Sequence, residues 1–216
     1  MNHNAFVLVL ACTIGMAAGR TDARGKSQKK EISLDQQVSA FLESQKNAWR
    51  DMNIPETDGK ALYDLIVKHG YKRALEIGTS TGHSGVWIAW ALSKTGGKLI
   101  TLEIDEERHR EALDHFKKAG VGSIIDARLG DAHDIVPSLD GPFDFVFSDA
   151  DKEGYKKYAE WLIPKLTVGG CFTAHNVLNG YIGTHELLDY VKSLPNVETT
   201  ILRSSVSGIS LSFKKR

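Results

Sequence analysis

The chain has 216 residues, of which 42% are apolar and 25% are charged, as is usual for one globular domain with a sizeable core. Lys and Arg together number 27 and Asp and Glu also number 27, so the charge balance gives no argument for a nucleic-acid partner. Only two cysteines are present, Cys12 and Cys171, which leaves no basis for a disulfide framework or a zinc site built on cysteines.

The N-terminus differs in character from the rest of the chain. Residues 1–19 contain an apolar run and resemble a secretory signal peptide, with cleavage expected between Ala17 and Ala23. The run is too short for a confident membrane span, so we expect no stable span in the mature chain. No Lys or Arg precedes it, so an uncleaved anchor, a wrong start codon and a cytoplasmic location stay open beside a secreted or periplasmic one. A charged linker over 20–32 then leads to the predicted domain, 33–216.

Two helices are predicted at the start of this domain. Ser33 and Gln36 have the spacing of a capping box, so a helix is expected to begin after Ser33. We expect Pro55 to end this helical segment, because proline disrupts a helix interior. A second amphipathic helix is predicted over residues 59–69, with Gly70 as its C-cap.

From residue 73 onward, short apolar segments alternate with amphipathic ones. Strands are predicted over residues 74–78, 98–103, 124–129, 143–148, 171–174, 198–202 and 208–213. Helices are predicted over residues 84–92, 106–119, 155–166 and 184–194. This alternation is typical of parallel sheets, and the two successive strands at the end predict an antiparallel hairpin. The predicted fold class is α/β: Rossmann-like and doubly wound, with a mostly parallel seven-stranded sheet and an antiparallel C-terminal hairpin strand.

A glycine-containing loop follows the first strand, at the edge where ligands bind in such sheets. Gly78 and Gly82 allow a sharp turn and a close approach of the backbone to a ligand. Ser84 comes at the start of the next helix, whose free N–H groups favour an anionic group. The loop is neither G-x-G-x-x-G nor G-x-x-x-x-G-K, so it fits dinucleotide and Walker phosphate sites poorly.

The next two strand ends extend this candidate nucleoside site. Glu103 ends the second strand, where a carboxylate can accept hydrogen bonds from both hydroxyls of a ribose, or only help to cap the next helix. Asp131 and Ala132 follow the third strand, where the base of a nucleoside would lie. Asp131 can also be the N-cap of the following helix.

Chemically reactive side chains follow the fourth and fifth strands. The apolar strand over 143–148 leads into Asp149 and Lys152, which packing alone explains poorly; the alternative is an Asp N-cap beside a solvated Lys. His175 and Asn176 follow the fifth strand and reach the same edge of the sheet. Together with Asp149 they could converge on a divalent cation, with O, N and O ligands.

These motifs, in this order, resemble the cation-dependent O-methyltransferase family, which includes catechol and caffeoyl-CoA O-methyltransferases. The resemblance extends from about Met52 to the C-terminus. It rests on residues 78–84, 102–105, 130–132, 149–152 with Tyr155 and Tyr158, 169–170 and 176–178.

The resemblance implies S-adenosylmethionine as the methyl donor and a small phenolic or catechol-like hydroxyl compound as the acceptor. The residues that match donor contacts are Glu76, Gly78, Ser84, Glu103, Ala132 and Asp149, to which the loops add Gly82 and Asp131. The metal ligands of the family match Asp149, His175 and Asn176. Lys152 matches the catalytic lysine. The sequence is compatible with a homodimer.

In the implied chemistry, a bound cation lowers the pKa of the acceptor hydroxyl and holds it in place. Lys152, once the cation has helped it to lose its own proton, can take the hydroxyl proton. The sulfonium methyl is then attacked in line, and much of the acceleration comes from holding both reactants in near-attack geometry.

Two features depart from the family pattern. His175 stands where the family usually has Asp, which would shift the preference of a retained metal from Mg²⁺ toward Mn²⁺ or a softer transition metal. Alternatively, the metal has been lost and His175 is a catalytic general base. Residues 177–183 are a short connection where relatives carry a longer insertion, so we expect an open acceptor pocket and do not favour caffeoyl-CoA.

Two other functions are kept as alternatives. A nucleotide-dependent oxidoreductase could use the same sheet, but the missing G-x-G-x-x-G motif and the cluster over 149–152 argue against it. A catalytically silent module that binds S-adenosylmethionine without turnover is suggested by the histidine at position 175.

Overall fold

A computed structural model describes residues 32–49 and 52–216, and residues 32–216 form one compact unit. The leader predicted over 1–19 and nearly all of the linker predicted over 20–32 lie outside the described residues. Within the described ranges, no helix is both long enough and apolar enough to cross a bilayer.

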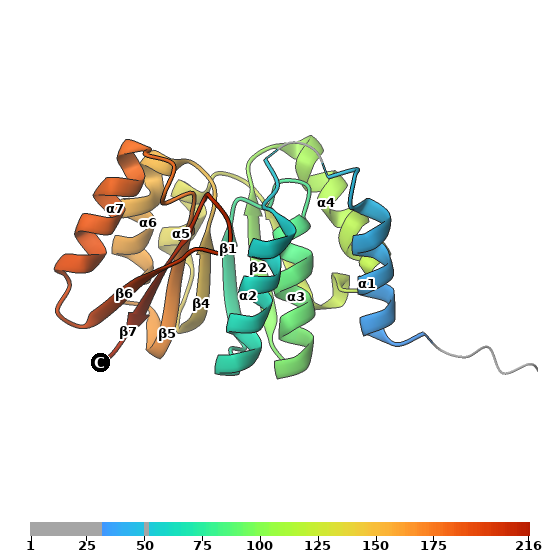
Figure 1. The fold of residues 1–216 in the computed structure, drawn as a ribbon, viewed down its shortest axis with the longest axis horizontal. Coiled ribbons are helices and arrows are strands. Elements are labelled where there is room, and N and C mark those ends of the chain that lie inside the picture. Colours follow the sequence, from blue (N-terminus) through green and yellow to red (C-terminus); the bar gives the residue numbers. More distant parts are fainter. Residues whose placement is uncertain (1–31, 50–51) are drawn as a thin grey trace, which may run out of the picture. The chain divides into compact units, whose positions relative to one another are not determined.

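In the described part of the chain, seven strands form one sheet (Figure 1). The strands are β1 (Arg73–Ile77), β2 (Lys98–Glu103), β3 (Ile125–Leu129), β4 (Phe143–Ser148), β5 (Leu166–His175), β6 (Val197–Leu202) and β7 (Ile209–Lys214). Their order across the sheet is β3-β2-β1-β4-β5-β7-β6. The pairs that involve β7 are antiparallel and the other pairs are parallel. The predicted α/β fold class is therefore confirmed.

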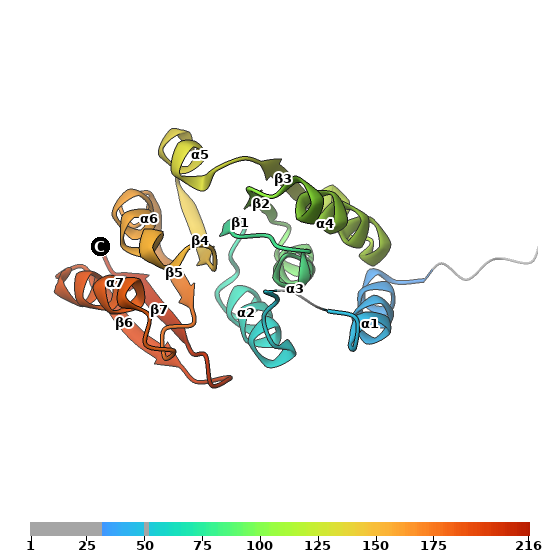
Figure 2. The same ribbon diagram turned by 90° about the horizontal axis from the view of Figure 1, so that it is seen from above.

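Helices cover both faces of this sheet (Figure 2). They are α1 (Leu34–Gln45), α2 (Glu56–His69), α3 (His83–Thr95), α4 (Glu106–Ala119), α5 (Ala132–Ser138), α6 (Tyr155–Leu162) and α7 (Ile182–Ser193). Side chains alternate between the faces of a strand. Accordingly, Leu75 and Ile77 of β1 pack under α5, α6 and α7, whereas Ala74 packs against α2 and α3 on the other face. The N-terminal helix α1 packs on α3 and α4 and completes a third apolar cluster.

Element boundaries differ from the predicted ones by a few residues, and proline explains two of the differences. Pro55 is the N-cap of α2 rather than the end of the preceding segment, because α1 has already ended at Gln45. The helix α6 ends at Leu162, ahead of Pro164, which has no N–H and disfavours a helical residue before it. β5 begins earlier than predicted, at Leu166, and its pairing with β4 then shifts register.

The parallel strands end at one edge of the sheet, and the strand order reverses beside β1. The pairs Ile77–Ser148 and Ser148–Ala174 place the ends of these strands at one level, so Asp149 after β4 and His175 at the end of β5 lie at the same edge. A crevice outside the carboxyl ends of strands at such a reversal is where ligands bind in open α/β sheets. The fold therefore places the candidate residues where a ligand site is expected.

The contact between α7 and the turn Lys152–Gly154 depends on a glycine. A Cβ on Gly183 would lie 2.0 Å from the carbonyl oxygen of Lys152, which is backbone and cannot swing aside. We expect Gly183→Ala to lower the free energy of unfolding by about 1–3 kcal/mol, because α7 must move away from this turn. The measurement is chemical denaturation, with Gly122→Ala as the control because the nearest atom to its added Cβ is 3.8 Å away. Equal stability of the two variants would contradict the prediction.

Candidate active site

A cavity of about 460 Å³ lies at the carboxyl ends of β1 to β4. This volume is in the range of small-molecule and cofactor sites. Five of the residues that the sequence assigned to donor binding line the cavity: Gly78, Glu103, Asp131, Ala132 and Asp149. The turn after β1 needs its glycine, because Gly78 has φ 96° and an added Cβ would lie 2.8 Å from the carbonyl oxygen of Asp149.

Glu103 ends β2 with its carboxylate in the cavity wall and its side chain buried. Its Oε2 accepts a hydrogen bond from the N–H of Ser80 at 2.7 Å, and its Oε1 accepts from the N–H groups of Ile104 and Asp105 at 3.1 and 3.0 Å. A carboxylate has about four lone-pair directions, so it can still accept from ligand hydroxyls. Glu103 can therefore both shape the loop around Ser80 and bind a ribose.

Three predicted donor contacts lie behind the cavity wall rather than in it. Glu76 is fully buried, and its Oε2 accepts from the hydroxyl of Thr101 at 2.6 Å. Gly82 is the N-cap of α3 with φ 98°, and the ring of Phe116 fills the space that a side chain would need. Ser84 is buried in the first turn of α3 beside Glu76. These residues lie beside the loop after β1 and do not line the cavity, so direct contact with the donor stays a prediction for them.

Asp131 caps a helix and also lines the cavity, so its position is compatible with both of the roles that the sequence left open. Its carboxylate accepts from the N–H of His133 at 2.8 Å and so caps α5, and the same residue lines the cavity. Ala132 follows at the start of α5, where a larger side chain would reduce the cavity.

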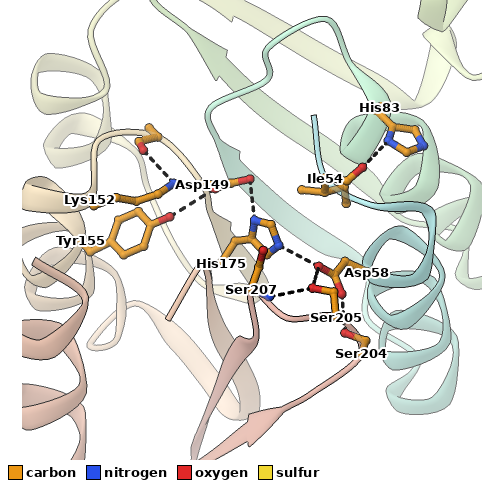
Figure 3. A network of polar contacts seen from close by, with 11 residues as sticks. Ile54, Asp58, His83, Asp149, Lys152, Tyr155, His175, Ser204, Ser205 and Ser207 are labelled. Carbon is orange, nitrogen blue, oxygen red and sulfur yellow. Dashed lines mark hydrogen bonds and ion pairs between the residues drawn. The ribbon is translucent and has the colours of Figure 1, made fainter. Parts of the chain in front are cut away.

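Asp149 follows β4 and joins the cavity wall to a polar cluster (Figure 3). Its Oδ1 accepts from the Lys152 ammonium at 2.7 Å and from the Tyr155 hydroxyl at 3.3 Å. Its Oδ2 lies 3.2 Å from Nδ1 of His175. The prediction that Asp149, Lys152 and His175 meet at one edge of the sheet is therefore confirmed.

The other ring nitrogen of His175 faces a second carboxylate. Its Nε2 lies 2.8 Å from Oδ2 of Asp58, a fully buried side chain in the first turn of α2 (Figure 3). The hydroxyls of Ser204 and Ser205 also donate to Asp58, at 2.5 and 2.7 Å. Burial alone would lower the pKa of His175, but the hydrogen bonds and charges of Asp149 and Asp58 raise it to about 9. Burial opposes ionisation of Asp58, yet hydrogen bonds from His175, Ser204 and Ser205 hold its pKa below the ordinary value.

The predicted metal site does not fit this geometry. An imidazole that donates from both nitrogens has no lone pair for a cation, and the two carboxylates lie at opposite nitrogens of the ring. Among the residues that the structure describes, no group of three or more His, Cys, Asp and Glu side chains is placed to hold a metal ion. Asn176 has φ 58°, and its amide makes no hydrogen bond to Asp149 or His175. The metal set Asp149, His175 and Asn176 and the role of His175 as a general base stay predictions, and the contacts of the ring favour neither.

Sequence reasoning missed Asp58 and its two serine partners. An acid in a first helical turn is explained locally by the helix dipole, so Asp58 carries no separate signal. Ser204 and Ser205 were visible only as a serine-rich turn between the last two strands. Tyr155 was matched to the family, but its hydroxyl contact with Asp149 follows from the packing of α6.

Comparison with known proteins gives one consistent family. A family model described as O-methyltransferase matches residues 26–188. The chain is 38% identical over 131 residues to a catechol O-methyltransferase of Niastella koreensis, covering 59% of each chain. It is 36% identical over 144 residues to caffeoyl-CoA O-methyltransferase 1 of Zea mays, covering 63% of this chain and 55% of the relative. The matched stretch thus spans less than two thirds of either relative.

Solved structures agree over more of the chain. The O-methyltransferase from Bacillus cereus in complex with SAH has a TM-score of 0.73 at 27% identity, covering 83% of this chain and 90% of that one. TomG from Streptomyces achromogenes, an O-methyltransferase in complex with SAM, has a TM-score of 0.74 at 26% identity, covering 86% and 92%.

Glu76 gives a pH-dependent stability that can be measured. Burial raises its pKa to about 7, so the folded state holds the proton more tightly than the unfolded state. Stability is therefore lost as the pH rises from the ordinary value of 4.5 to about 7. Between pH 5 and pH 8, we expect the free energy of unfolding of Glu76→Gln to rise by about 2–3 kcal/mol relative to that of the native chain. Glu186→Gln, at an exposed position of α7, is the control, and parallel pH profiles for all three proteins would contradict the prediction.

Proposed function

Since the chain belongs to the O-methyltransferase family, we propose that it transfers a methyl group from S-adenosylmethionine to a hydroxyl of a small phenolic or catechol-like acceptor. The observation that carries this proposal is that Glu103 and Asp149 lie in the wall of one cavity. The ribose of the donor binds at the first carboxylate, and its sulfonium lies near the second.

The charge of the cavity wall supports a cationic donor. The wall contains the carboxylates of Glu103, Asp131, Asp149 and Asp151 and the guanidinium of Arg108. Carboxylates attract the sulfonium and ammonium groups of S-adenosylmethionine, whereas they repel the pyrophosphate of a dinucleotide. The wall therefore favours S-adenosylmethionine over a nicotinamide cofactor.

Lys152 is the general base in this proposal. Its amino group lies 2.7 Å from Asp149, a residue of the cavity wall, and its side chain is 20% exposed. An amine that has released its own proton to solvent accepts the proton of the hydroxyl. The bond from this oxygen to the methyl carbon forms as the carbon–sulfur bond breaks, which leaves S-adenosylhomocysteine and the methylated acceptor.

The acceptor class follows from the relatives and from the chain that borders the site. The relatives are named for catechol and for caffeoyl-CoA. Only residues 177–183 connect Asn176 to Thr184 of α7, which leaves little chain to enclose a long thioester substrate. The smaller acceptor class is therefore favoured.

Donor binding is tested at Glu103. Glu103→Ala removes the acceptor of both ribose hydroxyls, and we expect the affinity for S-adenosylhomocysteine to fall by about 100-fold or more in calorimetric titration. Asp105→Ala is the matched control, because Asp105 also accepts a backbone N–H at 2.9 Å but is exposed and does not line the cavity. A folded Glu103→Ala protein with unchanged affinity would remove the ribose assignment.

Methyl transfer is tested with a labelled donor and a panel of catechols. We expect the native chain to label the acceptor oxygen and Lys152→Met to be slower by about 100-fold or more, with its affinity for S-adenosylhomocysteine retained. Lys156→Met, an exposed lysine on α6, is the control. Binding of S-adenosylhomocysteine without transfer to any acceptor would instead indicate a silent donor-binding module. A thermal shift with NAD alone would indicate an oxidoreductase.

A further inference from the structure

The imidazole of His175 is clamped between two carboxylates that come from different parts of the fold. Nδ1 faces Asp149 at 3.2 Å and Nε2 faces Asp58 at 2.8 Å. An ionised carboxylate only accepts hydrogen bonds, so both ring nitrogens must donate and the ring carries a positive charge. His175 itself is 3% exposed, so water does not compete for these contacts.

The carboxylate of Asp58 has further hydrogen-bond partners besides His175. Asp58 is fully buried and accepts from Ser204 and Ser205 as well as from His175. Ser205 is in turn oriented by the N–H of Ser207, which donates to its hydroxyl at 3.1 Å. An unpaired buried carboxylate is strongly destabilising, so the partners of Asp58 are required for this charge to be buried.

The charges in this cluster balance without an added ion. Before Lys152 releases its proton, the negative charges of Asp58 and Asp149 face the positive charges of His175 and Lys152, each at hydrogen-bond distance. A divalent cation brings two positive charges to a pair of carboxylates, and here the chain provides two of its own. The cation would also have to displace His175 from both partners before it could bind.

We propose that His175, held between Asp58 and Asp149, takes the place of the divalent cation on which the resembled family depends, so that methyl transfer by this chain needs no metal. The proposal rests on the methyltransferase function proposed above. His175 is a positioning residue: it fixes the direction of Asp149 in the cavity wall and leaves the proton of the acceptor to Lys152.

Metal binding tests the proposal directly. The chelator-treated, desalted protein is titrated with Mn²⁺, and free Mn²⁺ is followed by electron paramagnetic resonance. We expect no Mn²⁺ to bind to the native chain, and we expect a chelator to leave the affinity for S-adenosylhomocysteine and the transfer rate unchanged. Binding of one Mn²⁺ per chain, or transfer that is lost with chelator and restored by a metal, would overturn the proposal.

The variant His175→Asp tests whether the imidazole occupies the position of a cation between Asp58 and Asp149. It gathers three carboxylates around one point, so we expect it to bind Mn²⁺ and to gain thermal stability when Mg²⁺ or Mn²⁺ is added. His185→Asp adds the same charge at an exposed position of α7 and should show neither effect. A folded His175→Asp protein that still binds no Mn²⁺ would refute the proposal.

The two proposals fail in different ways. If the native chain transfers no methyl group to any acceptor, the proposed function is lost, while the Mn²⁺ titration still decides whether the cluster holds a metal. If His175→Asp does not fold, the titration and the chelator test on the native chain decide alone.

Discussion

The candidate site depends on the carboxylate of Asp149, which belongs both to the cavity wall and to the buried charge cluster. One of its oxygens accepts from Lys152 and Tyr155, and the other faces His175. The sheet register places it, because it directly follows Ser148 at the end of β4. A ligand in the cavity therefore meets a carboxylate whose direction is set by three neighbours rather than by solvent.

Each charged group in this cluster needs a close partner, because burial removes its hydration. Removing a charged group from water is unfavourable by several kcal/mol unless close partners compensate for the lost hydration. Asp58 and His175 satisfy this condition through each other and through the serines of the turn between β6 and β7. Because these groups come from α2, β5 and the turn between β6 and β7, the polar contacts also join α2 to the C-terminal hairpin.

Two glutamates near the cavity have the same side chain but different surroundings. Glu103 ends β2, receives three backbone N–H donors and faces the cavity, which is an environment suited to an ionised acceptor. Glu76 lies within β1, where its Oε1 has no hydrogen-bond partner among the described residues and burial raises its pKa to about 7. The first is therefore placed where a ligand can reach it, whereas the second is hydrogen-bonded to Thr101 and Ser84 inside the fold.

The sequence by itself determined the order and type of the elements, because apolar periodicity and turn residues are local properties of the chain. It also assigned Gly78, Glu103 and Asp149 to one site, since parallel strands end at a common edge of the sheet. It could not separate residues in the cavity wall from residues behind it, such as Glu76, because that depends on packing.

Only the tertiary structure decided which groups face the ring of His175. From its position at the end of β5 this residue could be a metal ligand or a base, and both roles require a free lone pair on the ring. Asp58, which occupies the position beside Nε2, is 117 residues away in the chain and is brought to the ring by the packing of α2. Protonation depends on the groups within hydrogen-bond distance, and no local pattern in the sequence records which groups those are.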